Sequence, residues 1–148
     1  MSYVLTAVFG RPAMIDDLVH PLLARSITLG GGFAMRPVVE PGDEDDVPFD
    51  PLDVDALDDA FGPLLATAST GGPIAYVHIE MFGGPADEVV AVWRDGEMVW
   101  CASGEELDDR LSHEAFRMIG VEAPAGGDEF DALGLGRHRE TEAWLGEP

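Results

Sequence analysis

The sequence predicts an α+β fold: a single domain over residues 1–148, with one antiparallel sheet and helices packed on one face of it. Two observations support this class. Three β-forming segments follow one another between residues 74 and 101, and shorter helical patterns flank them. The chain is also 46% hydrophobic at 148 residues, which is enough apolar content for one core.

The central segments predict a three-stranded meander over about 74–101. Its strands are the β-branched and aromatic segments 74–82, 89–94 and 97–101. Asp95-Gly96 separates the last two strands. An Asp-Gly pair between alternating β-formers is typical of a two-residue hairpin, because both turn positions need positive φ.

The N-terminal part predicts two strands and two helices. Residues 3–9 are apolar and β-branched, which favours a strand, and a helix is expected from Pro12 to about Val19 because proline suits a first helical position. Gly30-Gly31-Gly32 predicts a flexible joint before a strand over 33–39, which Pro37 would place at a sheet edge. Apolar residues at helical spacing predict another helix over about 54–68.

The C-terminal part predicts short helices. Ser103 and Glu106 have capping-box spacing, which predicts a helical turn over 104–111. Ser112 is predicted to cap a second helix, which Gly120 would end in a left-handed conformation. Trp144 is predicted to pack the tail onto the body.

Charge is the strongest signal for function. The chain has 29 acidic and 8 basic residues, a net charge of -21, and all its basic residues are arginine. Such a surface repels nucleic acid and anionic membranes and attracts basic proteins. Residues 40–59 hold ten acidic residues and no basic one. The predicted partner-binding surface therefore comprises Asp43, Glu44, Asp45, Asp46, Asp50 and Asp53.

Several functional classes lack their sequence signals. A calcium loop starting at Asp43 would need glycine where Pro48 stands, and the three glycines at 30–32 lack the lysine of a phosphate loop. We therefore predict no metal site and no cofactor, and the sequence leaves open whether the clustered carboxylates bind cations loosely. Cys101 is the single cysteine, so no intrachain disulfide is possible. No signal peptide or membrane span is recognised, which predicts a cytoplasmic protein.

A second candidate site lies on the first strand of the meander. Tyr76, His78 and Glu80 alternate onto one face, where they could line a groove, and a histidine beside a glutamate could relay a proton. The basic pair Arg137 and His138 could join this groove and bind an anion. The simpler interpretation is a solvated strand face, with the basic pair bonded to the chain's own carboxylates.

Parts of the chain resemble a family of small uncharacterised bacterial proteins of actinobacterial type. The resemblance is carried by the segment 76–84 (Tyr-Val-His-Ile-Glu-Met-Phe-Gly-Gly), by 91–96, and by the C-terminal segments 128–131, 135–137 and 141–144. The family often has glutamate where His78 stands and glutamine near Glu88. Some members look like immunity or toxin-neighbourhood proteins, but no activity follows from the shared motif.

Two functional hypotheses follow. The first is a small non-enzymatic protein of immunity or inhibitor type that binds a basic protein through the acidic stretch. The alternative is an enzyme or small-ligand-binding protein that uses the groove near Tyr76, His78 and Glu80. The absence of a nucleophile motif favours the first hypothesis. The oligomeric state is not predicted.

Overall fold

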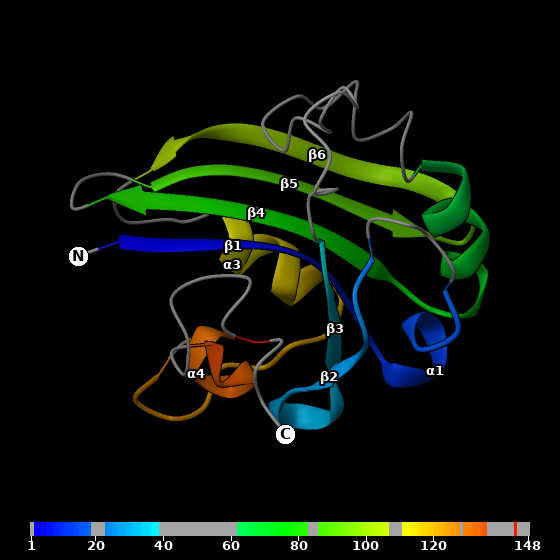
Figure 1. Ribbon diagram of the computed structural model, residues 1–148, viewed down its shortest axis with the longest axis horizontal. Coiled ribbons are helices and arrows are strands. Elements are labelled where there is room, and N and C mark those ends of the chain that lie inside the picture. The colour runs from blue at the N-terminus through cyan, green and yellow to red at the C-terminus, as the bar shows by residue number, and fades with distance from the viewer. Residues whose placement is uncertain are drawn as a thin grey trace.

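The computed structural model describes residues 2–18, 23–38, 62–82, 86–106, 111–127, 129–135 and 144. A six-stranded antiparallel sheet of order β2-β3-β1-β4-β5-β6 dominates it (Figure 1). The strands are β1 (Ser2–Gly10), β2 (Ile27–Thr28), β3 (Ala34–Pro37), β4 (Ile74–Phe82), β5 (Ala86–Arg94) and β6 (Glu97–Glu106). Helices pack against the sheet, so the predicted α+β class is confirmed.

The helical elements are short. They are α1 (Pro12–Ile15), α3 (Leu111–Met118), α4 (Glu129–Leu133), the 3-10 turns η1 (Gly30–Gly32) and η2 (Ser69–Gly71), and a helix over 62–68. None of the described helices has the length and apolar content needed to cross a bilayer. The part of the predicted helix before residue 62 lies outside the described residues.

The predicted meander is confirmed and is longer than expected. Asp95 and Gly96 form the β5–β6 turn with φ values of 53° and 87°, as a type I′ hairpin requires. Strand β6 continues to Glu106 and pairs with β5 over its whole length. The helical turn predicted from residue 104 is therefore wrong for 104–106. Backbone bonds to β5 replace the local capping box there, because a paired strand satisfies every backbone group along that side.

Strand β3 is not at the sheet edge. It lies between β1 and β2, and Pro37 stands opposite Ala7 of β1. The next residue donates its N–H to Thr6 of β1, so Pro37 turns its own backbone groups away from β1. On that side only the Pro37 carbonyl is used, as acceptor for the Ala24 N–H at 2.8 Å. The missing proline N–H therefore costs no bond to β1.

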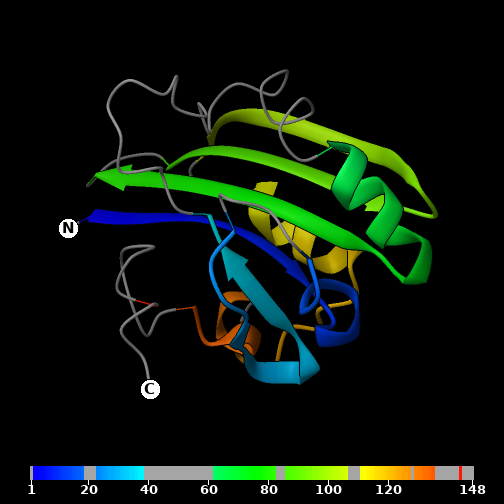
Figure 2. The ribbon, with the colours of Figure 1, turned by 45° about the vertical axis from the view of Figure 1, so that its right-hand side comes forward.

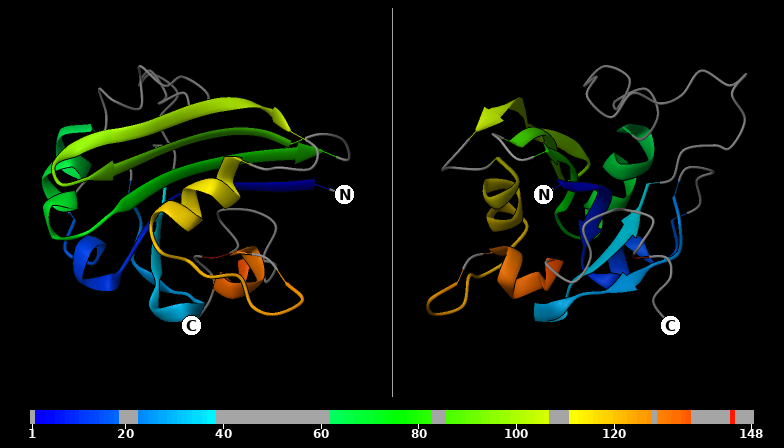
Figure 3. Two further views of the ribbon diagram at one scale, coloured as in Figure 1. Left: turned by 180° about the vertical axis from the view of Figure 1, so that it is seen from behind. Right: turned by 60° about the vertical axis from the view of Figure 1, so that its left-hand side comes forward.

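Both faces of the sheet are covered, whereas the sequence predicted helices on one face. Figure 3 shows α3 and the helix over 62–68 on opposite sides of the sheet. The α3 face holds buried residues that include Phe9, Val77, Ile79, Phe116 and Trp144. The opposite face holds another buried set that includes Val8, Ile15, Leu65, Tyr76 and Trp93. The central strands are apolar on both sides, and each side must therefore be shielded from water.

The α3 face is closed by aromatic packing. The Phe9 and Phe116 rings meet edge to face, with centroids 4.9 Å apart and planes at 71°. Trp144 is fully buried in the same cluster, which confirms that this tail residue packs onto the body. On the opposite face, α1 and the helix over 62–68 lie at the same end of the sheet (Figure 2).

Helix α3 is fixed at both ends. Its N-terminus is held by Glu88 of β5, whose carboxylate accepts the backbone N–H of Ser112 at 3.0 Å and also its hydroxyl. The predicted cap by Ser112 is thus replaced by a carboxylate from the sheet, which suits the partial positive charge of a helix start. At the other end Gly120 has φ 101°, as predicted, and the N–H groups of Gly120 and Val121 reach back into the helix.

The glycines at 30–32 form a packed turn and not a flexible joint. A Cβ at Gly30 would lie 2.2 Å from the backbone oxygen of Ala132 in α4. The absence of a side chain at residue 30 therefore lets η1 and α4 approach each other closely.

We predict that Gly30→Ala destabilises the protein by about 1–3 kcal/mol, because the new methyl group would collide with backbone that must move. Gly104→Ala is the matched control, since a Cβ at Gly104 meets no atom within 4 Å. Urea unfolding followed by circular dichroism measures both. Equal stability of the two variants would show that the η1–α4 contact is not tight.

Candidate functional site

The structure tests only part of the predicted sites. Asp43, Glu44, Asp45, Asp46, Asp50 and Asp53 lie outside the described residues, as do Arg137 and His138. Tyr76, His78 and Glu80 all lie on β4 and alternate onto the face opposite α3.

Tyr76 is part of the core. Its side chain is fully buried in the cluster that also contains Val8, Ala91 and Trp93. The alternation of residues along β4 predicted that Tyr76 lines a groove, and its burial shows that this prediction is wrong. Since α1 and the helix over 62–68 cover the second face as well, Tyr76 contributes to packing there.

His78 links two strands through a hydrogen bond. It is 1% exposed and stands directly opposite Thr6 of β1 in the sheet register. The Thr6 hydroxyl lies 2.7 Å from the His78 Nδ1 atom, and the His78 Nε2 atom lies 3.3 Å from a Glu80 carboxylate oxygen. The structure therefore brings together the predicted His78–Glu80 pair and adds Thr6 to it.

The three groups lie in the order hydroxyl, imidazole, carboxylate, but only the first two share a hydrogen bond. That bond joins the Thr6 hydroxyl and His78 Nδ1, whereas His78 Nε2 is close to Glu80 without forming a hydrogen bond to it. Thr6 is only 8% exposed, and the Glu80 side chain is 30% exposed. The carboxylate is therefore the end that meets solvent, which favours a role in positioning the strands.

A second polar cluster joins α3 to α4. Glu129 is 7% exposed. One of its carboxylate oxygens lies 3.2 Å from His113 Nδ1, and the other lies 3.2 Å from Arg117 Nε. Arg117 also reaches Glu114 one helical turn away, at 3.3 Å. These contacts hold the two helices together. Within the described ranges, no three histidine, cysteine, aspartate or glutamate side chains are grouped closely enough to hold a metal ion.

Two other arginines also act inside the fold. Arg36 is 8% exposed and donates hydrogen bonds to the carbonyls at the end of α1, including Ile15 at 2.8 Å and Leu18 at 3.0 Å. Burial lowers the pKa of its guanidinium, and the nearby Asp16 carboxylate raises it in part. Arg94 donates to the carbonyl of Met118 at 3.1 Å.

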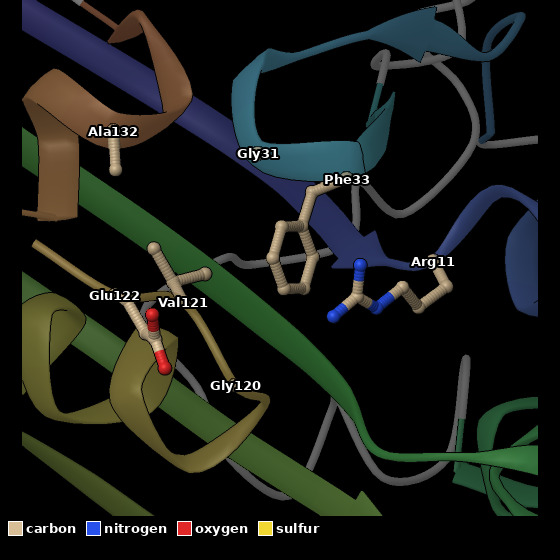
Figure 4. Close-up of a pocket in the computed structure, with 7 residues that line it drawn as sticks. All are labelled: Arg11, Gly31, Phe33, Gly120, Val121, Glu122 and Ala132. Atoms are coloured by element: carbon tan, nitrogen blue, oxygen red, sulfur yellow. The ribbon is translucent and has the colours of Figure 1, made fainter.

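Arg11 differs from these arginines. Its guanidinium lies over the Phe33 ring, with the central carbon 4.3 Å from the ring centroid. It also borders a pocket of about 350 Å³ (Figure 4). The pocket is lined by Arg11, Gly31, Phe33, Gly120, Val121, Glu122 and Ala132.

Sequence reasoning missed Thr6 and Arg11 for the same reason. Thr6 is one polar residue inside an apolar strand, and Arg11 is one arginine after a strand end. Neither has a spacing that points to chemistry. The pairing of β1 with β4 brings Thr6 to His78, and the approach of residues 120–122 to the end of β1 places Arg11 at the border of a pocket.

We predict that Thr6→Val lowers stability by about 1–3 kcal/mol, because it removes the hydroxyl from buried His78. Thr6→Ser is the control, since it keeps the hydroxyl and loses only a methyl group. Chemical denaturation of the two variants, and of each combined with His78→Phe, measures the coupling between the residues. A Thr6→Val loss no larger than that of Thr6→Ser would contradict the hydrogen bond between Thr6 and His78.

Comparison with protein-family models, curated proteins and solved structures gave no match for this chain. The resemblance to bacterial proteins with immunity-like members therefore stays a prediction. Any function must follow from the charges, contacts and pockets of the chain itself.

Proposed function

We propose that this protein is a non-enzymatic module of inhibitor or immunity type that binds a basic protein through its carboxylates. The proposal rests on the excess of acidic residues over arginines and on the bonds that the arginines form within the fold. Eight arginines stand against 29 acidic residues, and Arg36, Arg94 and Arg117 all bond to groups of the fold itself. Even if every arginine lay at the surface, the chain would keep an excess of 21 negative charges.

The described carboxylates support an acidic surface. Several are exposed at positions spread over the fold: Asp17, Asp87, Asp95, Glu97, Glu114 and Glu122. A surface of one sign raises the local concentration of oppositely charged partners and accelerates their association. The same surface repels nucleic acid, which favours a protein partner.

The acidic stretch is the proposed contact surface. Residues 40–59 hold ten of the carboxylates without a basic residue between them. Charges this dense in sequence give a stronger local field than single carboxylates dispersed over the sheet.

An enzyme or ligand-binding role at Tyr76, His78 and Glu80 is the second candidate. The order of Thr6, His78 and Glu80 favours it, because an activated nucleophile has a histidine between a hydroxyl and a carboxylate. The contact between His78 Nε2 and Glu80 is not a hydrogen bond, which weakens this argument. The burial of Tyr76, His78 and Thr6 weighs against it, because a substrate must reach the hydroxyl. The binding role therefore ranks first.

The proposal predicts that binding depends on the acidic stretch more than on net charge. The test variant carries Asp43→Asn, Glu44→Gln, Asp45→Asn and Asp46→Asn. The control variant carries Asp17→Asn, Asp87→Asn, Glu97→Gln and Glu114→Gln, which removes the same charge from exposed positions elsewhere. Each immobilised protein is exposed to cell extract, and the retained proteins are identified by mass spectrometry.

The wild-type chain and the control should retain the same basic proteins, and the test variant should retain much less of them. Retention should fall between 0.1 M and 1 M salt, because the screening length drops from about 10 Å to about 3 Å. Equal retention by the two variants would refute the acidic stretch as the contact surface. Partners that are not basic, or that resist salt, would refute the binding role itself.

A further inference from the structure

The side chain of Arg11 borders the pocket and has no polar partner among the described residues. The backbone carbonyl of Arg11 accepts the Met14 N–H at 2.8 Å, but its side chain forms no hydrogen bond or ion pair with any described residue and lies over the Phe33 ring. Stacking occupies the face of the guanidinium and leaves its N–H groups, which lie in its plane, available to an acceptor. In a chain with net charge -21, an arginine held this way is available to bind an external anionic group.

The η1 turn leaves space for the Arg11 side chain because Gly32 has no side chain of its own. Gly32 has φ 82°, and a Cβ there would lie 3.0 Å from a terminal nitrogen of Arg11. Phe33 is 3% exposed, so the ring that supports the guanidinium is itself fixed by the core. The guanidinium is therefore held in place before any ligand arrives.

A carboxylate borders the same pocket. Glu122 is exposed and makes no hydrogen bond or ion pair with any described residue, and this includes Arg11. Figure 4 shows it on the side of the pocket formed by Gly120 and Val121, with the Arg11 and Phe33 side chains across from it. The pocket thus offers one positive and one negative group that do not neutralise each other.

The wall of the pocket is partly polar and partly apolar. Phe33, Val121 and Ala132 supply its apolar part, although Phe33 and Val121 are themselves nearly buried. Gly31 and Gly120 line the remaining wall with no side chain to fill it. The volume of about 350 Å³ is at the lower end of the range found for small-molecule pockets.

We propose that this pocket binds a small zwitterion, a free α-amino acid with an apolar side chain. Its carboxylate would meet the Arg11 guanidinium, its ammonium group would meet Glu122, and its side chain would lie against Phe33, Val121 and Ala132. A simple anion would face the uncompensated charge of Glu122, and a simple amine would face that of Arg11. Only a ligand with both charges matches both walls. This proposal does not rest on binding of a basic protein.

Isothermal titration calorimetry on the full chain at neutral pH tests it with matched probes. The probes are leucine, phenylalanine, 4-methylpentanoate (leucine without its amino group) and 3-methylbutylamine (leucine without its carboxylate). We expect leucine or phenylalanine to bind, and each single-charge analogue of leucine to bind at least about tenfold more weakly than leucine.

Arg11→Gln and Glu122→Gln should each weaken binding of the amino acid by about tenfold or more, whereas Asp87→Asn, an exposed carboxylate on β5, should not change it. Both pocket side chains are exposed, so unfolding midpoints close to that of the wild type are expected and are measured alongside. The proposal is overturned if neither amino acid binds. Equal affinity for 4-methylpentanoate, or binding that persists in both variants, overturns it as well.

Discussion

The antiparallel pairing of β1 with β4 is the constraint on which the rest of the structure depends. The two strands are joined along almost their whole length, although more than sixty residues of sequence separate them. Each supplies apolar side chains to both core clusters. The same register sets Thr6 opposite His78, and the end of β1 delivers Arg11 to the pocket. A shift of one residue would exchange the two faces and separate all of these contacts.

The chain tolerates its charge because the sheet interior is nearly uncharged. Charged side chains that are buried have polar partners: Arg36 donates to backbone carbonyls, Glu88 accepts from Ser112 through one of its two oxygens, and Glu129 contacts His113 and Arg117. Burying an ionised group without such bonds would cost several kcal/mol. Most of the described positive charge is therefore tied to the fold. Arg11 differs, because its side chain forms no hydrogen bond or ion pair with any other residue that the structure describes, and it borders the pocket.

The sequence by itself determined the elements that depend on local chemistry. The hairpin at Asp95-Gly96 follows from two residues that tolerate positive φ, and the end of α3 follows from Gly120 in the same way. Strands β1, β4 and β5 follow from β-branched residues, whose shape favours extended backbone. The burial of Trp144 follows from its large apolar area. Each of these signals lies within a few residues of the feature that it predicts.

Only the tertiary structure decided the features that need two distant segments. The extension of β6 in place of a helical turn depends on pairing with β5, and the cap on α3 depends on Glu88 reaching across from the sheet. The second covered face, which buries Tyr76, and the hydrogen bond between Thr6 and His78 depend on packing and register. These contacts cannot be predicted from neighbouring residues, because contacts between distant segments depend on the free energy of the whole fold.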